Sequence, residues 1–259
     1  MHDTHTRFDP VSEDYSRFRP SYPGSLMRRL QQQFAATGQT PGAWIDVGCG
    51  TGIFTRQLAE VLPPDCRLLG LEPSAAMRAK AERLTAFPNV EYRNGMAESL
   101  PVADGSASAV SAATAAHWFD RPRFYEQAVR VLEPGGLLAI VQYVRDLERS
   151  PAAAALDAYL NEAGGPKAYR RPDYLAELAE VEGLELPMAW STAETLHLDA
   201  DAYVGLALSS SHAAACIVRL GEARVRADLQ DLAGRHAASD GLVPYGYRFD
   251  LVSANKVRS

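Results

Sequence analysis

The stretch IDVGCGTG, residues 45–52, constrains the fold of this 259-residue chain more than any other. Gly48, Gly50 and Gly52 alternate with other residues directly after a short apolar run. Glycine lets the backbone adopt positive φ and approach a ligand without a Cβ in the way. A loop that leaves a strand and opens a helix also presents N–H groups to a bound anion. The stretch therefore predicts a strand–loop–helix unit whose loop touches a ligand.

Short apolar runs alternate with amphipathic segments on both sides of this loop. Such alternation predicts βαβ crossovers, a mainly parallel sheet and a ligand beyond the carboxyl ends of the strands. Ser74 has the chemistry of a helix N-cap, and residues 134–136, Pro-Gly-Gly, predict a turn. The expected strands are residues 43–47, 67–71, 90–93, 107–112 and 137–144, and the expected helices are residues 26–34, 53–62, 74–84 and 123–132.

The pattern changes after residue 144. Residues 184–198 favour one or two strands, and residues 245–252 alternate weakly, as a closing strand would. We expect a helical insert that begins at Ser150 and Pro151 and precedes these last strands. The helices expected in this part of the chain are residues 151–163, 174–181, 200–209 and 222–236.

Composition excludes several classes of protein. The net charge of −6 argues against nucleic acid as the main partner, because phosphate binding favours a basic surface. The three cysteines form no CxxC pair and the histidines no HxxxH pair, so we expect neither a disulfide scaffold nor a metal site. The first residues lack an apolar signal core and no apolar run reaches eighteen residues. We therefore expect a cytoplasmic protein without a membrane partner.

Two acidic residues near the glycine loop narrow the choice of ligand. Asp46 stands in a buried strand position, where an acid needs a partner, so it either orients the loop or accepts from a ligand ammonium. Glu72 follows the second expected strand, where a carboxylate can bind both hydroxyls of a ribose. The spacing G-x-G-x-G, with Ile53 where a third dinucleotide glycine would stand, departs from the nicotinamide fingerprint. The loop and Glu72 together predict the ribose of an adenosine-type cofactor.

Five motifs in this order resemble the class I S-adenosylmethionine-dependent methyltransferases: IDVGCGTG, LEPS, NGMAESLP, AAHWFD and VLEPGG. The resemblance covers residues 40–145. It implies an α/β fold with a Rossmann-like, seven-stranded, mainly parallel sheet, and S-adenosyl-L-methionine as the cofactor. The chain departs from the family at Met96 and Ser108, where relatives often carry aspartate. We therefore expect the adenine to be read by main-chain groups and an apolar wall.

The resemblance also implies positions for the cofactor-binding residues. The methionine part of the cofactor would lie against the glycine loop and the end of the fourth strand, the ribose against Glu72, and the adenine against the residues that follow the second and third strands. In that order the implied residues are Asp46, Gly48, Cys49, Gly50, Ala113, Thr114, Glu72, Pro73, Met77, Met96 and Ala97.

The amino-terminal segment is similar to one in the branch that contains the trans-aconitate methyltransferases. Tyr15, Arg19 and Tyr22 carry this similarity, and in that branch the segment folds over the cofactor as a lid. Arg19 would pair with the cofactor carboxylate and Tyr15 would close the methyl end, whereas an ordinary surface arm is the alternative. We expect one domain over residues 1–259, composed of a lid segment (1–40), a cofactor-binding core (41–145) and a helical insert or substrate cap with closing strands (146–259).

The expected substrate site lies at the same edge of the sheet. His117 follows the fourth strand and is the candidate general base, although His117 and Trp118 can equally line the pocket or pack the loop. Tyr22 and Tyr143 are the other candidate substrate contacts. The leading hypothesis is methylation of a small molecule, either a small acid on oxygen or a specialised metabolite on O, N or C. The alternatives are an S-adenosylmethionine-binding protein that catalyses another reaction, and an NAD-dependent oxidoreductase.

Overall fold

The computed structural model describes residues 20–39, 42–165 and 171–258. Strands and helices alternate through the first half, and helices dominate the part between β5 and β7. The strands are β1 (Ala43–Val47), β2 (Arg67–Leu71), β3 (Val90–Arg93), β4 (Ala107–Ala113), β5 (Leu132–Arg145), β6 (Leu184–Leu198) and β7 (Val243–Lys256). The helices are α2 (Gly24–Ala36), α3 (Ile53–Val61), α4 (Ala75–Leu84), α5 (Arg121–Val131), α6 (Pro151–Gly164), α7 (Tyr174–Ala179), α8 (Ala200–Leu208), α9 (Ser211–Leu220) and α10 (Glu222–His236).

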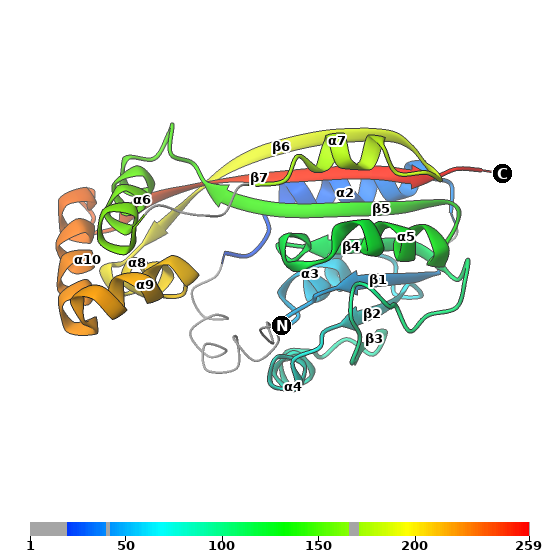
Figure 1. Cartoon of the computed structure of the whole chain (residues 1–259), viewed down its shortest axis with the longest axis horizontal. Coiled ribbons are helices and arrows are strands. Elements are labelled where there is room, and N and C mark those ends of the chain that lie inside the picture. The colour runs from blue at the N-terminus through cyan, green and yellow to red at the C-terminus, as the bar shows by residue number, and fades with distance from the viewer. Residues whose placement is uncertain (1–19, 40–41, 166–170, 259) are drawn as a thin grey trace.

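The seven strands form one sheet in the order β3-β2-β1-β4-β5-β7-β6 (Figure 1). The pairs from β3 to β5 are parallel, and β7 runs antiparallel to both of its neighbours. The strand order reverses direction at β1, since β2 lies on one side of β1 and β4 on the other. In sheets of this kind the ligand crevice lies at that reversal, beyond the carboxyl ends of the strands. The α/β, mainly parallel sheet is therefore confirmed, and it places the glycine loop at the crevice.

Apolar side chains cover both faces of the sheet because they alternate along each strand. Trp44, Leu68 and Ala139 belong to a cluster with α2, α3 and the helices that follow β5. Ile45 and Leu138 belong to the opposite cluster, with α5 and α7. The central strands β1, β4 and β5 are thus buried between two helical layers, and they read as apolar runs for that reason.

Helices α6, α8, α9 and α10 gather at one end of the molecule, beyond the carboxyl end of β5 (Figure 1). An ion pair of 3.1 Å between Arg145, at the end of β5, and Asp157 of α6 links this group to the sheet. Both side chains are less than one-fifth exposed. The rings of Tyr203 in α8 and Tyr245 in β7 also pack edge to face, with their centroids 5.7 Å apart.

The sequence-based expectations fail at two places. The Pro-Gly-Gly segment 134–136 lies inside β5 rather than in a turn, because β5 begins at Leu132 and carries an irregularity opposite β4 between Ala107 and Ala109. The segment 184–198, expected as one or two strands, is one strand with a bulge between Glu185 and Met188, so it is not one of the failures. Helix α9 was not expected, although Ser210 caps its start through the backbone N–H of Ala213 and Gly221 follows its end.

In the described part of the chain, no single helix is both long and apolar enough to cross a membrane. Only α8 and α9 taken together, bent by 95° at their junction, reach that length and composition. The three cysteines, Cys49, Cys66 and Cys216, are buried and free.

Candidate functional site

The three glycines of the loop after β1 all have positive φ, but they face different surroundings. A Cβ on Gly48 would lie 2.7 Å from the Cβ of Ala115, and one on Gly52 would lie within 3 Å of the Tyr92 hydroxyl. A Cβ on Gly50 would meet only the sulfur of Met77, at 3.9 Å. Gly48 and Gly52 are therefore required by packing, whereas Gly50 leaves open space beside the backbone.

Glu72 joins the loop to the end of β2. One carboxylate oxygen accepts from the backbone N–H of Gly50 at 3.0 Å, and the other accepts from the backbone N–H of Ser74 at 2.9 Å. The side chain is 8% exposed, so these charge-assisted bonds are shielded from water. Glu72 thus fixes the backbone of Gly50 in place, in addition to the ribose contact expected from the sequence.

Asp46 lies behind the loop and is 1% exposed. Its carboxylate accepts from the hydroxyl of Thr55 on α3 at 2.6 Å and from that of Ser111 on β4 at 3.1 Å. The Ser111 hydroxyl in turn accepts from the indole N–H of Trp44. Burial raises the pKa of Asp46 to about 7, because the charged form loses its hydration. These contacts favour the loop-orienting role of Asp46 over a direct ligand contact.

The segment after β2 is held by a guanidinium. Nη1 of Arg78 donates to the carbonyls of Glu72 and Pro73, at 2.7 and 2.9 Å. Ser74 caps α4 through the backbone N–H of Met77, as its sequence position predicts. Met77 is 5% exposed and lies beside Gly50. Pro73 and Met77 are thus placed next to Glu72, as an adenine-binding wall requires.

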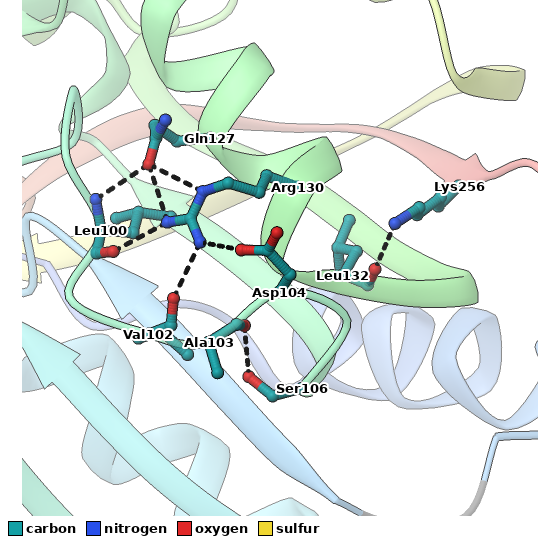
Figure 2. A network of polar contacts seen from close by, with 9 residues as sticks. All are labelled: Leu100, Val102, Ala103, Asp104, Ser106, Gln127, Arg130, Leu132 and Lys256. Carbon is teal, nitrogen blue, oxygen red and sulfur yellow. Dashed lines mark hydrogen bonds and ion pairs between the residues drawn. The ribbon is translucent and has the colours of Figure 1, made fainter.

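The segment that contains Met96 and Ala97 follows β3 and is anchored by α5. Figure 2 shows Arg130 of α5 donating to the carbonyls of Leu100 and Val102, and Gln127 accepting from the backbone N–H of Leu100. Ala97 is buried in the cluster with α5, whereas Met96 is 45% exposed. The exposed Met96 is therefore available as an apolar surface after the end of β3.

The end of β4 adopts an unusual backbone conformation. Thr114 has a φ of 54°, which is rare for a β-branched residue, and its backbone N–H donates to the carbonyl of Val141. Its hydroxyl shares a hydrogen bond of 3.0 Å with the hydroxyl of Tyr22. Strained backbone of this kind concentrates at functional sites. Ala113 directly precedes it, so both predicted residues lie at the carboxyl edge of the sheet.

Tyr22 and Tyr143 belong to one group of aromatic rings. Tyr22 is 6% exposed and packs edge to face on Phe54, with ring centroids 4.9 Å apart. Tyr143 lies 6.1 Å from Tyr22 and 5.3 Å from Tyr247. The backbone of Tyr22 is fixed from both sides by the amide of Gln57. The structure thus brings these two predicted substrate residues together beside Thr114.

His117 and Trp118 form a single 3-10 turn, Ala116–Trp118, directly after the end of β4. Their rings lie 4.9 Å apart, and Trp118 is 45% exposed. The turn is followed by Asp120, whose backbone N–H donates to Glu98. Both predicted residues therefore follow the carboxyl end of β4, in the segment between Thr114 and the start of α5.

Two predicted residues, Tyr15 and Arg19, lie outside the described residues. The cysteine of the loop, Cys49, is buried, and burial raises the pKa of its thiol.

The sequence reasoning did not find the residues whose hydrogen bonds hold the site residues and the segments around them in place. These are Thr55, Ser111, Gln57, Arg78 and Arg130. All are ordinary polar residues on strands and helices, and no local pattern marks them.

The part of the chain that contains this site matches one known family. A family model described as a methyltransferase domain matches residues 45–140, which run from β1 through the glycine loop to the middle of β5. Residues 45–140 of this chain are thus similar to methyltransferase domains. The recognition made from the five motifs is thereby confirmed for this domain.

Relatives of this methyltransferase domain have been named in several organisms. A Dictyostelium discoideum protein, itself named only provisionally as a methyltransferase, is 35% identical over 53% of this chain and 49% of its own length. The trans-aconitate 2-methyltransferase of Deinococcus radiodurans is 39% identical over 37% of this chain and 36% of its own length. The chain therefore spans about half or less of the length of these curated relatives.

A solved structure is similar in fold to nearly all of this chain. It is a provisionally named type II methyltransferase from Anaeromyxobacter dehalogenans, with a TM-score of 0.69 and 23% identity. The match covers 93% of this chain and 98% of that one. The likeness extends the agreement in fold beyond the core to the helices and closing strands.

Proposed function

We propose that this protein is an S-adenosylmethionine-dependent methyltransferase whose acceptor is a small molecule. The observation that carries the proposal is the hydrogen bond between the Glu72 carboxylate and the backbone N–H of Gly50. Of the three glycines in the loop, Gly50 is the one with open space beside its backbone. An adenosine-type cofactor needs both features together, a backbone stripped of side chains and an acid for the ribose. The acceptor class, a small acid or a metabolite methylated on O, N or C, rests on the likeness to the trans-aconitate branch.

The residues of the site fit this cofactor. The Gly48–Gly50 backbone and Thr114 would hold its methionine part, Glu72 the ribose, and Met77 with Met96 the adenine. Asp46 would act by holding the loop, since Thr55 and Ser111 occupy its oxygens. The cofactor supplies a methyl group on a sulfonium, which is already activated for transfer.

The chain has two tasks in such a transfer, to align the acceptor and to exclude water. Tyr22 and Tyr143 would form the apolar wall against which the acceptor lies. His117 would take a proton from a phenol or amine, whereas a carboxylate acceptor needs no base. Helices α6 and α8 to α10, at the same edge of the sheet, are proposed as the cap over the acceptor.

A calorimetric titration with S-adenosylhomocysteine, with NAD as the control ligand, tests the proposal. Micromolar binding of the first and none of the second is expected. Binding of NAD alone would contradict it and reassign Glu72 to a dinucleotide ribose. Turnover is then tested with labelled S-adenosylmethionine and panels of small carboxylic acids, phenols and amines. Label in the acceptor supports methyl transfer, and cofactor binding without label in any panel points to the non-transfer alternative.

A further inference from the structure

Strand β6 forms one edge of the sheet and is 15 residues long. It runs along the upper edge of the sheet in Figure 1, and none of its residues is buried. An edge strand presents a row of backbone N–H and C=O groups that can pair with another strand. Natural proteins block such pairing with lysine, proline or bulges.

The first part of β6 is blocked in this way, but the rest is not. A bulge lies between Glu185 and Met188, where Leu186 has a φ of 53° and Pro187 follows it. From Met188 to Leu198 the strand pairs with β7 in unbroken register. These eleven residues, MAWSTAETLHL, contain no proline, glycine, lysine or arginine, and Glu194 and His197 are their only ionisable side chains.

We propose that this open part of β6 pairs antiparallel with β6 of a second copy of the chain. The two seven-stranded sheets would then form one continuous sheet across a two-fold axis. An antiparallel pair of identical strands is self-complementary, because every contact occurs twice about the axis. This favours a second copy over a foreign peptide, whose sequence would have to match the edge independently. The proposal does not depend on the reaction that the site catalyses.

The pattern of the strand selects the register. A two-fold axis perpendicular to the sheet keeps each residue on its own face, so one residue of β6 must lie opposite itself. With Ala193 at the axis, all eleven residues from Met188 to Leu198 pair with the same residues of the second copy. The bulge before Met188 then lies outside the paired region. Trp190 then lies opposite Leu196, and Met188, which is 43% exposed, lies opposite Leu198. Aromatic and aliphatic cross-strand pairs of this kind stabilise a sheet.

The neighbouring registers are worse. With Glu194 at the axis, two carboxylates would lie directly opposite each other, which is destabilising. With Thr192 at the axis, Leu198 would pair inside the bulge, opposite Leu186. With Thr195 at the axis, the pairing would run only from Thr192 to Leu198. The register centred on Ala193 therefore pairs the largest number of residues and places no like charges opposite each other.

Analytical ultracentrifugation of the purified chain over a wide concentration range is the first test. A dimer that dissociates on dilution is expected. Ala193→Lys places two lysines directly opposite each other, so we expect the dimer's midpoint to move about fivefold or more to higher concentration. Ala237→Lys, at an exposed position after α10, is the matched control and should leave the midpoint unchanged. A wild-type chain that stays monomeric, or a dimer indifferent to Ala193→Lys, overturns the proposal.

Cross-linking tests the register independently. Opposed residues of antiparallel strands have Cα atoms about 4.5–5.5 Å apart, within the range of a disulfide. Ala193→Cys should therefore give a disulfide-linked dimer under mild oxidation, since the native cysteines are buried. Ala189→Cys should not, because its two copies would lie about 27 Å apart along the strands. Equal cross-linking of the two variants, or cross-linking at residue 189 only, contradicts the register.

Discussion

The hydroxyl of Tyr22 lies 3.0 Å from the hydroxyl of Thr114, 92 positions later in the chain. Thr114 holds a positive φ at the end of β4, and Tyr22 holds the segment that leads into α2. The hydrogen bond therefore connects the segment before α2 to the end of β4, where the backbone at the candidate cofactor site is strained. The sequence around neither residue predicts this contact.

A double-mutant cycle measures this bond. Tyr22→Phe and Thr114→Ala each remove one hydroxyl, and each should lower the free energy of unfolding by about 1 kcal/mol. The double variant should lose less than the sum, because both changes delete the same interaction. Urea unfolding of the four proteins gives the coupling energy. Strictly additive losses would show that the two hydroxyls do not stabilise each other in solution.

The glycines of the loop should respond differently to the same substitution. Gly50→Ala meets open space, so its cost is the positive φ alone, about 1–2 kcal/mol. Gly48→Ala has this cost and also drives a Cβ against Ala115 and Phe119, which adds roughly 1–3 kcal/mol. Denaturant unfolding should therefore rank Gly48→Ala as the less stable variant. Gly50→Ala should keep the fold and lose affinity for S-adenosylhomocysteine, and equal stability of the two variants would contradict the packing difference.

The buried carboxyl of Asp46 predicts a dependence of stability on pH. Because burial raises its pKa in the folded chain to about 7, the protonated form favours folding. That stabilisation is complete below the ordinary pKa of 3.8 and is lost as the pH rises through about 7. Over this window the effect on the free energy of unfolding is on the order of 4 kcal/mol. Thermal melts from pH 4 to pH 8 should show it, and Asp46→Asn should flatten the curve, whereas Asp65→Asn on the surface should not.

The core of the site could be predicted because its signals are local. A strand, three alternating glycines and a helix start follow one another within 11 residues from Ala43 to Ile53, and a serine three positions before Met77 caps α4. Such features depend only on residues that are close together in the sequence, so they can be recognised without the structure. The acid at the end of β2 was found for the same reason.

The supporting contacts could not be predicted because they are tertiary. Ser111 reaches Asp46 across 65 positions and Gln57 reaches Tyr22 across 35. The positive φ of Thr114 also contradicts the preference of a β-branched residue, so only packing can impose it. Helix α9 was overlooked because its apolar run is short, although its capping serine was visible.

Glu72→Gln should weaken the loop and the cofactor site together. An amide cannot accept both backbone N–H groups that the carboxylate accepts, so one hydrogen bond to a charged group is lost, worth about 1.5–3 kcal/mol. Calorimetry should show affinity for S-adenosylhomocysteine reduced roughly 10- to 100-fold. Glu60→Gln, on the exposed side of α3, is the matched control. Unchanged affinity in Glu72→Gln would remove Glu72 from the proposed cofactor site.

The role of His117 is decided by kinetics once an acceptor is known. If His117 is the base for a phenol or amine, His117→Ala should bind S-adenosylhomocysteine normally and lower kcat by about 10²–10⁴. The acidic limb of the pH profile of kcat should disappear in the same variant, an effect that a packing role would not produce. Trp118→Ala, which removes the exposed neighbouring ring, should instead raise the KM of the acceptor. An unchanged kcat and pH profile in His117→Ala, with a lower melting temperature, would assign the histidine to packing of the turn after β4.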